Sequence, residues 1–105
     1  MVQEITDSNF EEILFNNSRP VVIDFWARWC GPCKSVTAAI ELMAQEYDGQ
    51  VIIGKVDVDT NPRLTSKFGV RNMPTILYLK EGEVMGKQVG SASKSVLEEK
   101  LKAIL

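Results

Sequence analysis

The sequence of 105 residues contains no histidine and only two cysteines. Without histidine it has no Ser-His-Asp or Cys-His nucleophile pair, no imidazole metal ligand and no histidine pH switch. No apolar stretch approaches the roughly 20 residues with which a helix spans a bilayer. The first residues also lack the basic and apolar parts of a secretory signal peptide. We therefore expect a cytoplasmic protein that uses neither histidine chemistry nor a membrane anchor.

A large excess of charge of one sign is absent as well. Lysine and arginine number 12 and aspartate and glutamate 14, for a formal net charge of −2. With no basic run, nucleic acid or an anionic membrane is not expected as the main partner. A composition of 45% hydrophobic and 25% charged residues is typical of a soluble globular protein. The length predicts a single domain over residues 1–105.

The apolar runs predict four strands. Residues 21–26 and 51–56 are almost continuously apolar, as in strands that are buried on both faces. Residues 75–80 and 83–89 are predicted to form a hairpin around Glu81-Gly82.

Helical patterns separate these strands. Apolar residues spaced three and four apart predict a helix that begins at Cys33. Ser8 and Glu11 fit a capping box for a first helix, Asn61-Pro62 is typical of a helix start, and Ser93 can cap a last helix. This order of strands and helices predicts an α/β fold, in which a mixed sheet carries helices on both faces.

Both cysteines, Cys30 and Cys33, follow the 21–26 strand and are separated only by Gly31 and Pro32. Three interpretations are open for this pair. A structural disulfide closing so small a ring would contribute only about 2 kcal/mol in the chain-entropy model. A structural zinc site requires four ligands, of which the pair supplies two. A redox pair is the third interpretation, because cytosolic disulfides are usually transient, catalytic or sensing.

The redox interpretation fits the position of each sulfur. A helix N-terminus lowers the pKa of a cysteine thiol, because unpaired N–H groups favour negative charge. Cys30 lies at that tip and is expected to be an exposed nucleophile. Cys33 lies on the inward face of the helix and is expected to be the resolving thiol. Lys34 adds a cation beside the sulfurs, or is simply a solvated helix residue.

A base for Cys33 must be something other than histidine, and Asp24 is the best candidate. Strand alternation places Asp24 on one face with Val22 and Trp26, where burial would raise its pKa toward neutrality. Lys55, in the middle of the next strand, could pair with Asp24 and limit that rise. The alternative is that both side chains lie at an exposed sheet edge or strand end. Trp29, which lies in a loop, is expected to be a contact surface.

The segment from Phe25 to Lys34 resembles the active-site segment of the thioredoxin family. The resemblance extends over essentially the whole chain, through Asp24, residues 55–62, residues 70–75 and Val89-Gly90. It implies the thioredoxin fold, with a central mixed five-stranded β-sheet flanked by four α-helices, and a general protein disulfide reductase. Cys30 would attack a substrate disulfide and Cys33 would resolve the mixed disulfide. Asp24 would be the buried acid–base group, and Lys55 would lie beside it.

The resemblance also implies supporting residues, a docking surface and partners. Active-site support would come from Trp26, Trp29, Gly31, Pro32, Lys34 and a cis Pro74. The docking surface would consist of Trp29, Val58, Met73, Pro74, Val89, Gly90 and Ser91. The chain would be a monomer without a bound cofactor, re-reduced by thioredoxin reductase with electrons from NADPH. Its substrates would be disulfide-containing proteins such as reductases and peroxiredoxins.

Three residues depart from the family pattern. Ala38 replaces a frequent proline in the active-site helix, Arg28 replaces an acidic residue or proline, and Asn72 replaces a frequent glycine.

Two other functions remain open beside disulfide reduction. The apolar patch around Trp29 and Met73 could serve a redox-independent binding module, or the cysteine pair could act as an oxidant or isomerase.

Overall fold

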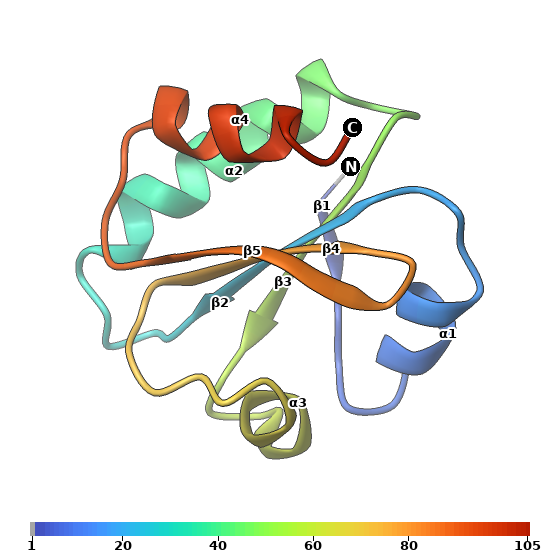
Figure 1. Ribbon diagram of the computed structural model, residues 1–105. Helices are drawn as coiled ribbons and strands as arrows, with labels where there is room; N and C mark the ends of the chain where they lie inside the picture. Colours follow the sequence, from blue (N-terminus) through green and yellow to red (C-terminus); the bar gives the residue numbers. More distant parts are fainter. Residues whose placement is uncertain (1) are drawn as a thin grey trace.

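The computed structural model describes residues 2–105, which form one five-stranded sheet and four helices (Figure 1). The strands lie in the order β1-β3-β2-β4-β5, so that β2 is central. In chain order the elements are β1 (Val2–Glu4), α1 (Phe10–Phe15), β2 (Val21–Trp26), α2 (Cys33–Glu46), β3 (Ile52–Asp57), α3 (Pro62–Lys67), β4 (Thr75–Lys80), β5 (Glu83–Val89) and α4 (Lys94–Lys102).

The sheet is mixed, as predicted. β1, β3 and β2 run parallel to one another, whereas β4 runs antiparallel to both β2 and β5. The carboxyl ends of β2 and β3 therefore meet the amino end of β4 and the carboxyl end of β5 at one edge of the molecule. Segments that are far apart in the sequence converge at this edge.

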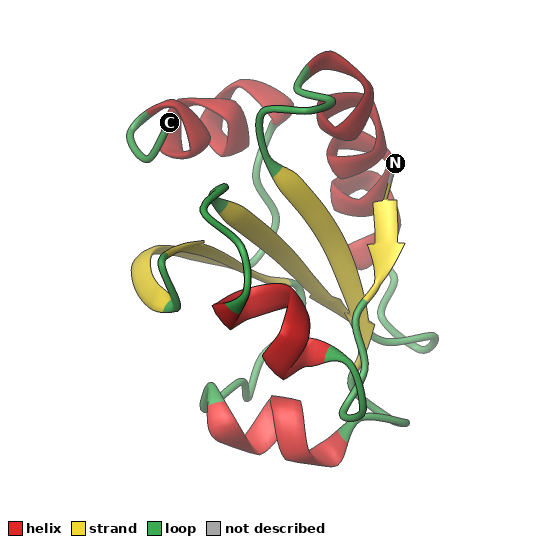
Figure 2. Ribbon diagram, turned by 90° about the vertical axis from the view of Figure 1, so that its right-hand side faces the viewer, coloured by secondary structure: helices red, strands yellow, loops and turns green. Residues whose placement is uncertain are grey.

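Helices cover both faces of the sheet (Figures 1 and 2). α2 and α4 pack on one face, where Ile40 and Leu101 join Val22 in one buried cluster. α1 and α3 pack on the other face, where Phe10 and Leu64 join Phe25 in a second cluster. β2 contributes to both clusters because its successive side chains point to opposite faces. None of the helices within residues 2–105 is long and apolar enough to cross a membrane.

Most predicted elements are confirmed. β2, β4 and β5 have the predicted bounds, and β3 begins and ends one residue later than predicted. Glu81 and Gly82 both have positive φ, 53° and 81°, as a two-residue hairpin turn requires. The side chain of Ser93 accepts a hydrogen bond from the N–H of Val96 and caps α4. The apolar pattern did not reveal β1, which is short and has one half-buried and two exposed residues.

The predicted start of a helix at Asn61-Pro62 is confirmed, whereas the predicted capping box of the first helix is wrong. α1 begins at Phe10 after the N-cap Asn9, so Ser8 and Glu11 form no capping box. Asn61 occupies the N-cap position of α3, but its side chain does not cap the helix. Asp7 does so instead, because its carboxylate accepts hydrogen bonds from the N–H groups of Arg63 at 3.1 Å and Leu64 at 2.8 Å. A loop near the amino terminus thus holds the start of α3.

We predict that Asp7→Ala lowers the free energy of unfolding by about 1–2 kcal/mol, because two N–H groups at the start of α3 lose their acceptor. Ser8→Ala is the matched control and should change it by less than about 0.5 kcal/mol, since Ser8 is exposed and caps no helix. Urea unfolding of both variants measures the difference. Equal losses in the two variants would show that Asp7 does not cap α3.

Candidate active site

The two cysteines lie where β2 ends and α2 begins. They form a disulfide in this structure, with their Cα atoms 5.4 Å apart. The N–H of Cys30 donates to the carbonyl of Ala27 at 3.1 Å, and the N–H of Lys34 donates to that of Gly31 at 3.2 Å. The chain therefore turns tightly between strand and helix, and Cys33 becomes the first residue of α2.

Cys30 is less exposed than predicted. Its exposed fraction is 6%, against 2% for Cys33, so both residues are buried in the disulfide form. The prediction of an exposed Cys30 is wrong in this form, because Trp26, Val58 and Met73 pack around the pair. Gly31 and Pro32 are exposed beside it, and a Cβ on Gly31 would meet no atom within 4 Å. The space beside this glycine is therefore open.

A cavity of about 310 Å³ adjoins the disulfide. It is lined by Trp26, Ala27, Arg28, Cys30, Cys33, Lys34, Thr37 and Lys55. Three of these residues are cationic and none is acidic. The cavity is large enough to admit water to the side of the site where proton transfer is expected.

Asp24 is fully buried in the middle of β2. Its Oδ2 accepts a hydrogen bond of 2.9 Å from the hydroxyl of Thr37, whereas Oδ1 has no hydrogen-bond partner among the described residues. Burial raises the pKa of Asp24 from 3.8 to about 6; the Thr37 hydroxyl and Lys55 oppose this rise and Glu41 adds to it. Because β2 is the central strand, the alternative of an exposed edge position is excluded for Asp24.

Lys55 lies directly across from Asp24 in the parallel pairing of β2 and β3. It is half-buried, and its Nζ lies 5.6 Å from the centroid of the Trp26 ring. No direct ion pair joins it to Asp24 in the described part of the chain. Lys55 thus acts on the Asp24 carboxylate through its charge, without a hydrogen bond.

The two tryptophans differ in exposure, as the sequence predicts. Trp26 is half-buried against the cysteines, while Trp29 is 67% exposed. The indole N–H of Trp29 donates to the carboxylate of Asp59 at 3.1 Å. Sequence reasoning assigned no role to Asp59, because a contact between a loop residue and a side chain 30 positions later leaves no local pattern.

The other expected docking residues lie around the disulfide. The Met73–Pro74 peptide bond is cis, as the resemblance implies, and Pro74 is buried. The N–H of Gly90 donates to the carbonyl of Pro74 at 2.9 Å, which places Gly90 and its exposed neighbours Val89 and Ser91 beside Met73 and Pro74. The structure thus brings together the ends of β2, β3 and β5 and the start of β4.

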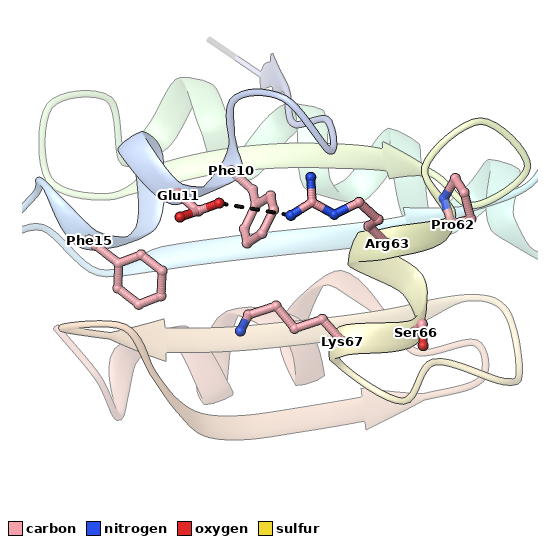
Figure 3. Close-up of a pocket in the computed structure, with 7 residues that line it drawn as sticks. All are labelled: Phe10, Glu11, Phe15, Pro62, Arg63, Ser66 and Lys67. Carbon is pink, nitrogen blue, oxygen red and sulfur yellow. Dashed lines mark ion pairs between the residues drawn. The ribbon is translucent and has the colours of Figure 1, made fainter.

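A second groove, of about 600 Å³, lies between α1 and α3 (Figure 3). Glu11 and Arg63 face each other across it at 4.0 Å, and Arg63 also lies over the ring of Phe10. The groove shares no lining residue with the cavity at the cysteines and contains no redox-active group. Among residues 2–105, no group of three or more His, Cys, Asp or Glu side chains is placed to hold a metal ion. The chemistry is therefore assigned to the cysteine site.

Comparison with known proteins decides the family. The family model described as Thioredoxin matches residues 1–103. The chain belongs to the thioredoxin family. It is 43% identical to a thioredoxin of Haemophilus influenzae over 91% of this chain and 90% of that protein. It is also 38% identical to a thioredoxin of Porphyra purpurea over 95% of this chain and 94% of that protein.

Family membership and the cysteine geometry together define the activity. This thioredoxin-family chain is a thiol–disulfide oxidoreductase that reduces protein disulfides. Its five-stranded mixed sheet with four helices is the thioredoxin fold.

We predict that Asp24→Asn stabilises the oxidised protein at pH 8 and has little effect near pH 4. The buried carboxyl has a raised pKa in the folded state, so its ionisation destabilises the fold progressively as the pH rises from 3.8 through about 6. Removing it should add about 3 kcal/mol to the free energy of unfolding at pH 8.

Urea unfolding at the two pH values measures this gain. Asp48→Asn, at an exposed turn, is the control and should show no such pH-dependent difference. A gain for Asp24→Asn that is equal at pH 4 and pH 8 would contradict the assignment.

Proposed function

We propose that Cys30 is the attacking thiolate and Cys33 the resolving thiol of this reductase. The observation that carries this assignment is that Cys30 precedes α2 and is the less deeply buried of the two residues, whereas Cys33 is the first residue of the helix and faces the interior. A substrate disulfide approaching over Gly31 meets the sulfur of Cys30 first.

The exchange then has two steps. The Cys30 thiolate attacks one substrate sulfur, so that a mixed disulfide forms and the substrate S–S bond breaks. The leaving sulfur takes up a proton from solvent, which replaces the one that Cys30 released when its thiolate formed. Cys33 next gives its proton to a base and attacks the sulfur of Cys30. The Cys30–Cys33 bond forms as the second substrate thiol is released. Two electrons and two protons pass to the substrate.

The Cys30 thiolate is stabilised by its surroundings. It lies at the N-terminus of a helix of 14 residues, whose first turn contains no acidic side chain. Unpaired N–H groups and the helix dipole favour a thiolate at this place. Arg28 and Lys34 line the adjoining cavity and add positive charge.

Asp24 is the proposed base for Cys33 and Lys55 its electrostatic partner. A carboxyl group with a pKa of about 6 is mostly ionised at neutral pH and still able to accept a thiol proton. Cys33, Thr37 and Lys55 line the adjoining cavity, and Thr37 and Lys55 are the neighbours of the buried Asp24. Lys55 keeps the pKa of Asp24 from rising further.

The proposed docking surface for substrate proteins surrounds the disulfide. It consists of Trp29, Val58, Met73, Pro74, Val89, Gly90 and Ser91, with Trp26, Gly31, Pro32 and Lys34 as active-site support. Exposed apolar area at Trp29 and Val89 supports this assignment, since an exposed apolar patch marks an interaction site. The backbone of Met73 would pair with the substrate chain.

We further propose that thioredoxin reductase re-reduces the disulfide with electrons from NADPH, so that this chain needs no cofactor of its own. Reductases and peroxiredoxins are the expected substrate classes. We propose a monomer that works in the cytoplasm. Among the relatives, the M-type thioredoxin of Pisum sativum is described as chloroplastic.

Replacing each cysteine separately tests the two roles. Cys33→Ser should accumulate a mixed disulfide through Cys30, because the resolving thiol is gone. Cys30→Ser should form little adduct, because Cys33 is buried beneath the entry side. Mass spectrometry after incubation of the reduced variants with a protein disulfide measures both. If Cys30→Ser formed an adduct on Cys33 as fast as Cys33→Ser forms one on Cys30, the assignment would be reversed.

Removing the proposed base tests the second step. Asp24→Asn should slow resolution by about tenfold or more at pH 7 and leave the first attack less affected. Rapid-quench measurement of the mixed disulfide separates the two rates. The exposed Asp48→Asn serves as the control. An unchanged resolution rate would remove Asp24 from the mechanism.

Arg28→Glu tests the electrostatic contribution to the thiolate. Reversing this charge should raise the pKa of the Cys30 thiol, because a nearby negative charge disfavours the thiolate. The pH dependence of alkylation of the reduced protein by iodoacetamide measures the shift. Arg63→Glu, in the groove between α1 and α3, is the matched control. Identical alkylation profiles for Arg28→Glu and the parent would refute the contribution.

A further inference from the structure

Thr37 makes an unusual contact for a threonine inside a helix. A helical threonine hydroxyl commonly bonds to a carbonyl of the preceding turn. Thr65 on α3 does so, since its hydroxyl donates to the carbonyl of Asn61 at 2.8 Å. The hydroxyl of Thr37 instead leaves its helix and donates to Oδ2 of Asp24 on β2 at 2.9 Å.

Thr37 also lies on the side of α2 that faces the reacting sulfurs. It follows Cys33 by four residues, and residues at this spacing share one helix face. Both residues line the cavity of about 310 Å³ beside the disulfide. Thr37 is half-buried there, so its hydroxyl is shielded while the cavity remains open to small molecules.

This contact makes the two oxygens of Asp24 different. Oδ2 is held by Thr37, while Oδ1 has no hydrogen-bond partner among the described residues. The strand neighbours of Asp24 are Lys55 on β3 and Ile76 on β4, so only one of them carries charge. The negative charge of Glu41 on α2 raises the pKa of Asp24. Thr37 is therefore the one side-chain hydrogen-bond donor to this carboxylate in the described chain.

We propose that Thr37 is a positioning residue for disulfide exchange, whose hydroxyl holds Oδ2 of Asp24 and leaves Oδ1 to take the proton of the Cys33 thiol. The inference rests on the proposed role of Asp24 as base. The proton moves from the Cys33 sulfur to Oδ1, directly or through water in the cavity. The Cys33 sulfur then bonds to Cys30 as the Cys30–substrate bond breaks, and Thr37 exchanges neither proton nor electron.

The contact also sets the pH range in which Asp24 is ionised. A hydroxyl that donates to a carboxylate favours the charged form, and here it opposes the effects of burial and of Glu41. Without the hydroxyl, Asp24 should become about a tenfold weaker acid, with Lys55 as the remaining favourable charge. Its ionised fraction at pH 6 should then fall about fivefold.

Thr37→Val and Thr37→Ser test this proposal as a pair. Valine keeps the branched shape and removes the hydroxyl, whereas serine keeps the hydroxyl. The titration of the Asp24 carboxyl carbon, followed by NMR in the reduced protein, should move to higher pH in Thr37→Val and stay near that of the parent in Thr37→Ser. Thr65→Val, which removes a helical hydroxyl on α3, should leave the titration unchanged.

Kinetics provide a second readout that a purely structural role would not change. In Thr37→Val the midpoint of the pH profile of the resolving step should move upward, with resolution about fivefold slower at pH 6 and little slower at pH 8. A rate reduced equally at every pH would contradict the proposal. So would an unchanged Asp24 titration in Thr37→Val, or a shift of the same size in Thr37→Ser.

These results are separable from a failure of the proposed function. If Asp24→Asn leaves resolution unchanged, Asp24 is not the base, yet the NMR titration still reports whether Thr37 controls its ionisation. If Asp24→Asn slows resolution and Thr37→Val alters neither titration nor profile, Asp24 keeps its role and the positioning role of Thr37 is overturned.

Discussion

A carboxylate in the middle of the central strand is the constraint around which this active site is built. Desolvation makes the charged form of Asp24 unfavourable and raises its pKa to about 6. One hydrogen bond from Thr37 and the charge of Lys55 offset part of that cost. Ionisation of the buried Asp24 therefore lowers the stability of the fold at neutral pH. The same raised pKa allows this carboxyl to exchange protons with a buried thiol. The chain has no histidine, so the Asp24 carboxyl takes the place of an imidazole as a group that changes charge near neutral pH.

The sheet topology explains why the remaining parts of the site meet. β2 and β3 are parallel and end at the same edge, while β4 starts there and β5 returns to it. Cys30, Val58, Met73 and Gly90 come from segments up to 60 residues apart, yet each adjoins one of these strand ends. α2 begins at this edge as well, so its N-terminus reaches the sulfurs. The cysteines and the proposed docking residues therefore lie together at one edge of the sheet.

Local patterns in the sequence predict the strongly apolar parts of this frame and the cysteine pair, and they miss what depends on distant contacts. β2, β4 and β5 have the predicted bounds because their apolar runs are long and end at turn residues. The apolar pattern does not predict β1, because its few residues are held mainly by pairing with β3. The capping of α3 by Asp7 and the hydrogen bond from Thr37 to Asp24 depend on which side chains packing brings within reach. The covering of Cys30 follows likewise from residues of three other segments.

The reduction potential of the Cys30–Cys33 pair decides in which direction electrons flow between this chain and its substrates, and it can be measured directly. The purified protein is equilibrated against glutathione buffers of graded ratio, and the oxidised fraction is measured by thiol alkylation and mass spectrometry. For a protein disulfide reductase we expect a potential more negative than about −200 mV, in the range of thiol reductants. A potential near about −120 mV, in the range of a strong disulfide oxidant, would contradict the account.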